Sequence, residues 1–307
     1  MILVTGGTGF LGSALLRTLD AQQSAVRCVG FQSRRHAGRG TQEYVATDLR
    51  QVDPDSAIFD SVDTIVHLAS TTIPETSMAD MPFDARSNLD MALRLLEAAR
   101  VRGIKHFLFA SSAGTVYGDP VRLPTRETDP TDPWSSYGVV KLMIEKYIGL
   151  YARLHGIRGI SLRISNPYGS GQFLGAPIGV LARLLQHAHD GTDFRVWGDG
   201  SIVRDYFHVD DLMRAMLLAL AEPAIPSGVY NVAAGRGTSI NELIALVREV
   251  TGRALTVHYE PARRIDVPKI WLDATKFRAA TGWRPTIELE DGVRDLWRNL
   301  LATRGGR

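Results

Sequence analysis

The octapeptide TGGTGFLG, residues 5–12, constrains the fold of this chain more than any other stretch. Gly6, Gly9 and Gly12 are spaced three apart, directly after the apolar run ILVT and at the start of a predicted helix over 10–20. A turn this tight needs residues without a Cβ, and the helix N-terminus offers N–H groups and partial positive charge to phosphates. A glycine trio alone is a weak signal. Between a strand and a helix, however, it predicts a dinucleotide site.

Short apolar runs alternate with helix-length segments through the first half of the chain. The runs predict strands at 2–5, 25–31, 63–70, 104–112 and 158–165, and helices at 10–20, 88–103 and 136–155. This alternation is typical of a parallel sheet covered on both faces. We therefore predict an α/β fold, a Rossmann-type doubly wound parallel sheet.

After residue 165 the pattern becomes less regular. A helix over 177–190 is followed by a strand at 194–198, and 204–220 reads as a short strand leading into a helix. We assign residues 1–165 to a dinucleotide-binding domain, to which elements near 202–235 return. Residues 166–307 are expected to form a smaller C-terminal α/β lobe that binds the substrate.

Composition excludes several classes of protein. Thirty-five Lys and Arg residues balance 33 Asp and Glu residues, so the net charge of +2 does not favour nucleic-acid binding. Cys28 is the single cysteine, which rules out an intrachain disulfide and a multi-cysteine metal site. No apolar stretch reaches the about 20 residues that span a bilayer, and the N-terminus does not resemble a signal peptide. We expect a cytoplasmic protein that uses no metal and binds no membrane.

The adenosine end of the predicted dinucleotide site lacks an expected acid. An NAD site normally has an Asp or Glu at the end of its second strand to hold the ribose 2′-hydroxyl. Here that position falls near Gly30, and Ser33, Arg34 and Arg35 follow it. Either these arginines lie in a solvated loop, or they favour the 2′-phosphate of NADP. Asp48, after a probable third strand, suits the adenine amino group.

A tyrosine and a lysine share one helix face in SSYGVVK, residues 135–141. Tyr137 and Lys141 are at i and i+4, about 6 Å apart along the helix axis. A phenol with its ordinary pKa of about 10 is a poor base at neutral pH, but a neighbouring ammonium group favours the phenolate. Such a pair is common by chance, and it indicates a catalytic role only when it follows a dinucleotide-binding turn in the same chain.

Seven motifs together carry a resemblance over nearly the whole chain. They are TGGTGFLG (5–12), VHLAS (66–70), SSAGTVYG (111–118), YGVVK (137–141), LRISNPYG (162–169), GDGSIVRDYFHVDDL (198–212) and RRID (263–266). In this order the chain resembles the extended short-chain dehydrogenase/reductase family, and within it the UDP-glucose 4-epimerase group.

The resemblance implies that Tyr137 removes a sugar hydroxyl proton while a hydride leaves the same carbon, and that Lys141 also holds the nicotinamide ribose. The family usually has a Ser or Thr that bonds the reacting oxygen, at the position occupied here by Ala113. Ser112 or Thr115 could supply that hydroxyl instead, or either could only cap the end of the strand.

The resemblance also implies two binding sets. The dinucleotide would contact Gly6, Gly9, Phe10, Leu11, Gly12, Ser33, Arg34, Asp48, Leu49, Leu68, Ala69, Ser70, Asn88, Tyr137 and Lys141. We expect Asn88 to open its helix as an N-cap as well as to order the cofactor. The nucleotide diphosphate of the substrate would contact Asn166, Arg195, Trp197, Arg204, Arg263 and Asp266. Arg204 and Arg263 would clamp its phosphates, since guanidinium groups present paired donors.

Three functions follow, in order of preference. The first is a nucleotide-sugar 4-epimerase that is a homodimer, holds NAD and acts on a UDP-linked sugar. The second is a 4-keto-sugar reductase that uses NADPH, which the missing acid near Gly30 favours. The third is a dinucleotide sensor without chemistry, against which the presence of both Tyr137 and Lys141 argues. A dehydratase is disfavoured, because SSAGTVYG lacks the Asp-Glu pair that such chemistry usually adds.

Overall fold

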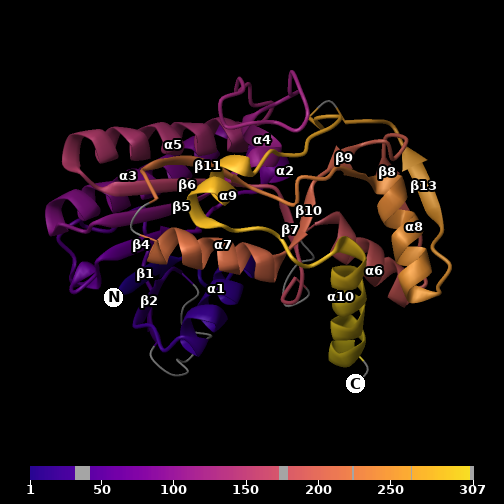
Figure 1. Ribbon diagram of the computed structural model, residues 1–307, viewed down its shortest axis with the longest axis horizontal. Coiled ribbons are helices and arrows are strands. Elements are labelled where there is room, and N and C mark those ends of the chain that lie inside the picture. The colour runs from indigo at the N-terminus through magenta and orange to yellow at the C-terminus, as the bar shows by residue number, and fades with distance from the viewer. Residues whose placement is uncertain (32–41, 173–178, 223–224, 264, 305–307) are drawn as a thin grey trace. The chain divides into compact units, whose positions relative to one another are not determined.

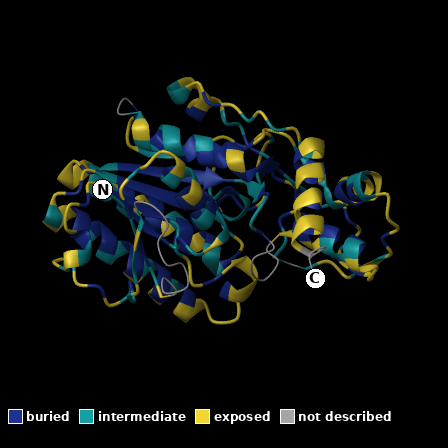
Figure 2. Ribbon diagram, turned by 90° about the horizontal axis from the view of Figure 1, so that it is seen from below, coloured by how far each residue is buried: buried dark blue, intermediate teal, exposed yellow. Residues whose placement is uncertain are grey.

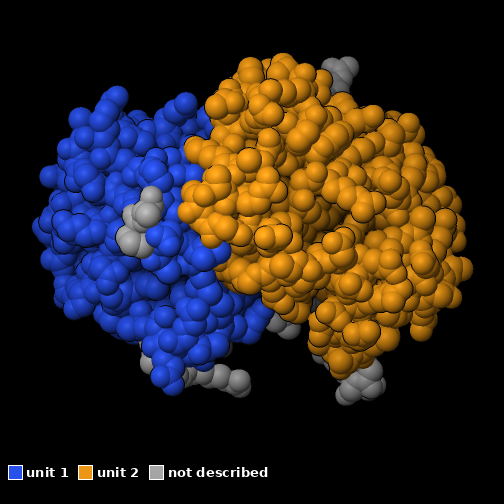
Figure 3. Space-filling model, in the orientation of Figure 1, with its two compact units in different colours: residues 1–116, 133–163, 216–230 blue, residues 117–132, 164–215, 231–307 orange. Residues whose placement is uncertain are grey.

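The computed structural model describes residues 1–31, 42–172, 179–222, 225–263 and 265–304. Contacts divide the chain into two compact units, which Figure 3 colours separately. Unit 1 comprises residues 1–116, 133–163 and 216–230, and unit 2 comprises 117–132, 164–215 and 231–307. None of the helices in these described ranges is both long enough and apolar enough to cross a membrane.

A seven-stranded sheet forms the centre of unit 1, with only the last residues of two strands assigned to unit 2. Its order is β11-β6-β5-β4-β1-β2-β3. The strands are β1 (Ile2–Thr5), β2 (Val26–Val29), β3 (Gln42–Val45), β4 (Thr64–His67), β5 (His106–Ser112), β6 (Arg158–Ile164) and β11 (Gly228–Val232). The pairings from β3 through β1 to β5 are all parallel. The predicted α/β class with a Rossmann-type parallel sheet is confirmed.

Long helices cover this sheet because their apolar residues recur at helical spacing. They are α1 (Phe10–Ala21), α3 (Met81–Arg102) and α5 (Ser136–His155), and α3 and α5 lie side by side (Figure 1). The buried faces of α3 and α5 join the strands in one core that includes Leu95, Phe107 and Ile144. Figure 2 shows buried strands at the centre of this sheet, whereas the edge strand β3 has no fully buried residue. Each fully buried side chain of this size contributes roughly 1.5–3 kcal/mol.

The helix expected to start at residue 88 begins at residue 81 instead. Asp80 is its N-cap, and the Asp80 carboxylate accepts a hydrogen bond from the Phe83 backbone N–H at 2.9 Å. Pro82 lies in the first turn, where its missing N–H costs nothing. The prediction that Asn88 caps this helix was therefore wrong. Asn88 is an interior, buried residue of α3.

The chain also contains shorter connecting elements. They are the 3-10 turn η2 (Ala57–Phe59) and the short helices α2 (Pro74–Ser77) and α4 (Ala113–Val116). A longer helix, α7 (Val209–Ala221), follows β10 (Tyr206–His208) along the chain.

Unit 2 is built from three two-stranded sheets and helices around a second core. The strand pairs are β7 (Asn166–Tyr168) with β10 (Tyr206–His208), β9 (Val203–Arg204) with β12 (Thr238–Ser239), and β8 (Phe194–Trp197) with β13 (Val257–Glu260). The helices are α6 (Val180–Asp190), α8 (Ile240–Thr251), α9 (Thr275–Thr281) and α10 (Leu289–Arg304). Apolar faces of α6, α8 and α10 meet in the core, at residues such as Leu185, Leu243 and Leu296.

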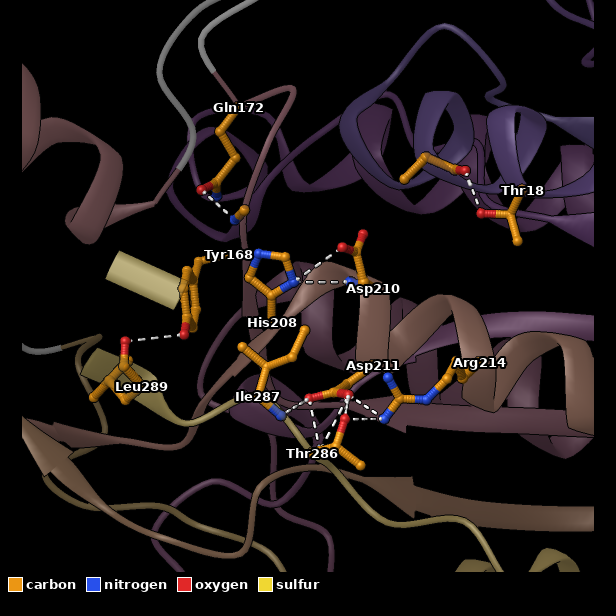
Figure 4. A network of polar contacts seen from close by, with 12 residues as sticks. Thr18, Tyr168, Gln172, His208, Asp210, Asp211, Arg214, Thr286, Ile287 and Leu289 are labelled. Atoms are coloured by element: carbon orange, nitrogen blue, oxygen red, sulfur yellow. Dashed lines mark hydrogen bonds and ion pairs between the residues drawn. The ribbon is translucent and has the colours of Figure 1, made fainter. Parts of the chain in front are cut away.

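A buried carboxylate ties the first turn of α7 to the segment before α10. Asp211 accepts hydrogen bonds from the backbone N–H groups of Thr286 and Ile287, at 3.2 and 3.1 Å, and forms an ion pair with Arg214 (Figure 4). The Trp283 indole N–H donates to the Asp211 carbonyl oxygen at 3.0 Å. These bonds hold the segment 283–287 in place although it has no regular secondary structure.

A second buried carboxylate organises the loops that flank Arg204. Asp205 is 1% exposed and accepts from the backbone N–H groups of Ala234, Gly235 and Leu272 at 2.9, 3.0 and 3.2 Å. Burial raises the pKa of Asp205 to about 6, even though these bonds oppose the shift.

Asp205→Ala should therefore destabilise the protein by about 3–5 kcal/mol, because three backbone N–H groups lose a charged acceptor at once, and the bond from Leu272 is buried. The measurement is the urea dependence of unfolding. Asp295→Ala is the control, since the Asp295 side chain on α10 is 57% exposed, and it should change the free energy of unfolding by less than about 0.5 kcal/mol. Equal effects of both changes would contradict the anchoring role of Asp205.

Candidate functional site

In the glycine turn, the backbone of residues 6–12 packs closely against itself and against the backbone at Ala69. Gly6 has a φ of +71°, and a Cβ on it would lie 2.7 Å from the Ala69 nitrogen. A Cβ on Gly12 would collide with the Gly6 carbonyl oxygen. Gly9 is the N-cap of α1 and offers no side chain to its first N–H groups, and the first turn of α1 carries no acid. The turn thus leaves room and backbone donors for a phosphate group.

The end of β4 is fixed to this turn by Thr5. The Thr5 hydroxyl oxygen accepts from the backbone N–H groups of Leu68 and Ala69, both at 3.2 Å, and contacts the His67 ring nitrogen Nδ1 at 2.8 Å. The His67 ring stacks on Phe109, with 5.6 Å between centroids. Burial lowers the pKa of His67 to about 3, so this ring is neutral and structural.

A cavity of about 490 Å³ lies over the glycine turn within unit 1. Its lining consists of Gly6, Thr8, Gly9, Gly30, Phe31, Thr47, Asp48, Leu49, Arg50, Leu68, Ala69, Ser70, Thr71, Thr72, Ile73, Met91 and Tyr137. The structure thus brings together eight of the residues expected at the dinucleotide: Gly6, Gly9, Asp48, Leu49, Leu68, Ala69, Ser70 and Tyr137. Phe10, Leu11, Gly12, Asn88 and Lys141 do not line this cavity. Ser33 and Arg34, like Arg35, fall outside the described residues.

The wall of the cavity at the ends of β2 and β3 holds an arginine that the sequence analysis missed. Arg50 donates from Nε to Asp48 Oδ1 at 2.9 Å and from Nη2 to Oδ2 at 2.8 Å. The Arg50 guanidinium carbon lies 5.4 Å from the centroid of the Phe31 ring. Bonding to Arg50 lowers the pKa of Asp48. The Asp48 carboxylate thus pairs with Arg50 at the cavity wall, and its expected contact with the adenine amino group stays a prediction.

Tyr137 and Lys141 lie next to each other on α5, as their spacing predicts. The Lys141 nitrogen Nζ donates to the Ala110 carbonyl oxygen at 2.8 Å, and lies 4.6 and 5.3 Å from the ring centroids of Phe109 and Tyr137. Burial lowers the pKa of Lys141 to about 8. Burial, assisted by the charge of Asp84, raises the pKa of Tyr137 to about 12. In this state burial outweighs the expected effect of the ammonium group, and Tyr137 holds its proton at neutral pH.

The hydroxyl groups considered for the third catalytic position lie where β5 ends and α4 begins. Thr115 donates from Oγ1 to the Ser112 carbonyl oxygen at 3.2 Å, which is the capping role considered for it. Ala113, between them, is 1% exposed and has no group that can donate to a sugar oxygen. Ser112 and Thr115 remain the two candidates.

Asn88 connects α3 to the cavity wall. Its side-chain oxygen accepts from the Thr71 backbone N–H at 2.9 Å, and its Nδ2 donates to Thr71 Oγ1 and to Asp84 Oδ1, both at 2.9 Å. Asn88 thus holds Thr71, which lines the cavity, without lining the cavity itself.

A second group of predicted site residues gathers in unit 2. Arg263 donates to Asp266 from Nε at 2.8 Å and from Nη2 at 3.0 Å, and its guanidinium carbon lies 5.8 Å from the Trp197 ring centroid. Arg204 is the second predicted cation of this group, and burial together with the charge of Arg263 lowers its pKa. Trp197 is 43% exposed. Two cations, one anion and an exposed ring are suited to a diphosphate attached to a base.

The two remaining predicted residues of this group, Arg195 and Asn166, contact other partners. Arg195 lies on β8 with Trp197 and forms an exposed ion pair with Glu260 at 3.6 Å. Asn166 begins β7, in register with Tyr206 of β10, and its backbone N–H donates to the Asp205 carbonyl oxygen at 2.9 Å.

Comparisons with known proteins identify relatives over the full length of the chain. The sequence profile of the NAD dependent epimerase/dehydratase family matches residues 2–233. The UDP-glucose 4-epimerase of Mycolicibacterium smegmatis is 32% identical over 299 residues, covering 95% of each chain.

Two solved structures are similar throughout. The UDP-glucose 4-epimerase with UDP-glucose from Thermotoga maritima has a TM-score of 0.92 and 34% identity, covering 98% of this chain and 99% of that one. The UDP-glucose 4-epimerase complex with NAD from Thermus thermophilus has a TM-score of 0.88 and 31% identity, covering 97% of this chain and 98% of that one.

The lack of an acid at Gly30 gives a testable prediction for cofactor choice. A Cβ on Gly30 would meet nothing within 4 Å, so Gly30→Asp is sterically allowed. The new carboxylate should accept from the ribose 2′-hydroxyl and strengthen NAD binding about 5- to 30-fold, while repelling the 2′-phosphate of NADP. Titration of the cofactor-free protein with both dinucleotides measures this. Gly30→Asn, of equal size without charge, should leave NADP binding nearly unchanged, and an equal loss of NADP binding in both variants would contradict the prediction.

Proposed function

Because the chain belongs to the NAD-dependent epimerase/dehydratase family, we propose that it is a nucleotide-sugar 4-epimerase that holds NAD and acts on a UDP-linked sugar. The observation that carries this proposal is the Tyr137–Lys141 pair at the wall of the cavity above the glycine turn. The pair supplies the proton-transfer group that 4-epimerisation needs, directly beside the place where a dinucleotide fits.

The residues of unit 1 fit NAD. The glycine turn leaves a phosphate-sized approach to the N-terminus of α1, and the same cavity is lined by Phe31, Arg50 and Tyr137. When bound, NAD supplies a hydride acceptor for C4 of the sugar and a positive charge that favours the Tyr137 phenolate.

Proton transfer is the task of the chain's own residues. Tyr137 Oη takes the proton of the sugar 4-hydroxyl and later returns it to the oxygen at the same carbon. Lys141, held by the Ala110 carbonyl and the Phe109 ring, places its ammonium group by the Tyr137 ring and stabilises the phenolate. Ser112 or Thr115 donates to the sugar oxygen in place of Ala113.

Substrate recognition is assigned to the C-terminal lobe. Arg204 and Arg263 bind the two phosphates, Asp266 steers Arg263, and the exposed Trp197 borders the base together with Arg195. Asn166 assists at the diphosphate. We keep the division into a dinucleotide-binding domain over residues 1–165, with elements near 202–235, and a substrate lobe over 166–307 as part of this proposal.

A homodimer in the cytoplasm completes the proposal. Val139 and Met143 are exposed one turn apart on α5, Leu154 is exposed near its end, and Val101 is exposed on the neighbouring α3. Such an apolar surface on two packed helices suits a second copy of the chain. A reducing compartment agrees with the single, buried Cys28.

One experiment separates the three functions considered. The purified protein is incubated with UDP-glucose or UDP-galactose and, separately, with NADPH and a UDP-linked 4-keto-sugar, and the sugars and the reduced cofactor are quantified. An epimerase approaches the same sugar ratio from both sides without net formation of reduced cofactor. A reductase instead consumes NADPH in proportion to a 4-keto-sugar, and a sensor binds the dinucleotide and changes neither sugar.

Tyr137→Phe should lower kcat about 100-fold or more, because the ring stays and the ionisable oxygen is lost. NAD binding should persist, as measured by fluorescence or calorimetric titration. Turnover within a few-fold of the original protein would refute the role of Tyr137. Simultaneous loss of NAD binding would instead indicate a damaged cavity.

Arg263→Ala and Arg204→Ala should each weaken UDP binding by about 1.5–3 kcal/mol, roughly 10- to 150-fold in Kd. Arg263→Lys keeps the charge and loses the paired donors, so its UDP affinity should lie between those of the original protein and the alanine variant. Calorimetric titration with UDP measures the change, and NAD affinity is the control for folding. Unchanged UDP affinity in all three variants would exclude this cluster as the diphosphate site.

A further inference from the structure

A fully buried carboxylate near Tyr137 has no role in the function proposed above. Asp84 lies in the first turn of α3 and is 0% exposed. Its position in MPFDARSN looks like an ordinary acid that favours a helix N-terminus. A carboxylate at such a position is normally solvated, because removing it from water carries a large penalty unless it is bonded.

Three side chains from three parts of unit 1 donate to this carboxylate. Thr72 Oγ1 and Asn88 Nδ2 donate to Oδ1 at 2.5 and 2.9 Å, and Ser136 Oγ donates to Oδ2 at 2.6 Å. Thr72 belongs to the cavity wall, Asn88 to α3, and Ser136 to the first turn of α5, directly before Tyr137. One carboxylate therefore joins the cavity wall to the start of the helix that carries Tyr137.

Neighbouring bonds complete the connection. The Tyr137 backbone N–H donates to Ser77 Oγ of α2 at 3.2 Å, and the Ser135 hydroxyl caps α5 by accepting from the Gly138 backbone N–H at 3.3 Å. The backbone at Tyr137 is thus held from two sides, by α2 and by the Asp84 cluster.

Hydroxyl and amide groups, not cations, satisfy Asp84. In the part of the chain that the structure describes, no ion pair includes it. Its charge is therefore not cancelled locally and acts on the buried groups around it. It raises the pKa of Tyr137, in the same direction as burial, and favours the charged form of Lys141.

We propose that Asp84 is a positioning residue for the reaction, whose carboxylate clamps the Thr71–Thr72 wall of the cavity to the first turn of α5 and holds a negative charge next to the segment that carries Tyr137. The assignment of a reaction rests on the proposed function, but the clamp and its charge are properties of unit 1 alone. The charge of Asp84 acts in the same direction as burial, which raises the pKa of Tyr137 to about 12 and keeps its proton in place at neutral pH.

Other titratable groups lie on the elements around Tyr137 and Lys141. Glu145 on α5 also favours charged Lys141, but it is held in a buried ion pair with Arg163 of β6 at 2.7 Å. His67 of β4 is neutral. Glu75, on α2, is exposed. The element α4 carries no charged residue, and β5 carries only His106, at its opposite end. Of the groups named here, Asp84 on α3 is therefore the buried charge that raises the pKa of Tyr137 on the neighbouring helix α5.

The test is Asp84→Asn, which removes the charge and keeps a group of the same shape. The Asn oxygen can still accept from Thr72 and Asn88, and its NH₂ can donate to Ser136 Oγ. The titration of Tyr137 is followed by ¹³Cζ-tyrosine NMR with and without NAD, and assigned with Tyr137→Phe. We expect its midpoint to move down by about 0.5–1 pH unit, as removal of a nearby buried charge requires. The rising limb of the rate against pH should move by a similar amount in the same direction.

The matched control is Asp90→Asn on the same helix. Asp90 is half exposed and pairs with Arg94 at 3.2 Å, so this change should leave the titration of Tyr137 unmoved. A lower melting temperature for Asp84→Asn with no movement of the Tyr137 midpoint would overturn the proposal and leave Asp84 a purely structural group.

Ser136→Ala separates the clamp from the charge, and also serves if Asp84→Asn does not fold. It removes one donor and keeps the carboxylate, so the Tyr137 midpoint should move by less than about 0.3 pH unit while kcat falls about 3- to 10-fold. An unchanged kcat would exclude the clamp. Because the NMR titration is not a rate measurement, it decides the role of Asp84 even if the sugar chemistry proposed above is wrong.

Discussion

Much of unit 1 depends on the absence of a side chain at Gly12, because a Cβ there would collide with the Gly6 carbonyl oxygen. That close approach sets α1 directly against the end of β1 and directs its N-terminus toward the cavity. The Thr5 hydroxyl, at the end of β1, fixes Leu68 and Ala69 at the end of the neighbouring strand β4. One backbone contact thus determines both where a phosphate can bind and which strand ends surround it.

The other side of the cavity is organised by buried polar groups instead of by close packing. Lys141, Glu145 and Asp84 are each 6% exposed or less. Burying a charge without a partner costs a large free energy of desolvation, so each group has partners. Lys141 donates to a carbonyl oxygen and lies near two rings, Glu145 pairs with an arginine, and Asp84 accepts from three uncharged donors. Glu145 and Asp84 both favour the charged form of Lys141, but of the two carboxylates only Asp84 also acts to raise the pKa of Tyr137. This difference helps to explain why the environment of Tyr137 favours its protonated form.

The sequence was sufficient for the features that local patterns encode. Apolar runs and the glycine turn located β1, β2, β4, β5, β6 and the first helix, and the i, i+4 spacing placed Tyr137 beside Lys141. The start of α3 was missed because the capping residue Asp80 lies in a polar segment where apolar periodicity has not yet begun. Asp84 and Arg50 were missed for a related reason. In sequence each is an ordinary charged residue, and only the tertiary structure buries the first and bonds the second to Asp48.

The pKa of Tyr137 shows most clearly why sequence spacing alone could not describe the chemistry. Spacing establishes that an ammonium group lies near the phenol, which favours the phenolate. It does not reveal how much water each group loses, and here burial lowers the pKa of Lys141 to about 8 and raises that of Tyr137 to about 12. Burial destabilises the charged forms of both groups, so the gap between them widens when neither has a ligand. If Tyr137 is the base that we propose, positive charge brought into the cavity by a dinucleotide would favour its phenolate, and occupation of that site would be a condition for base catalysis as well as for hydride transfer.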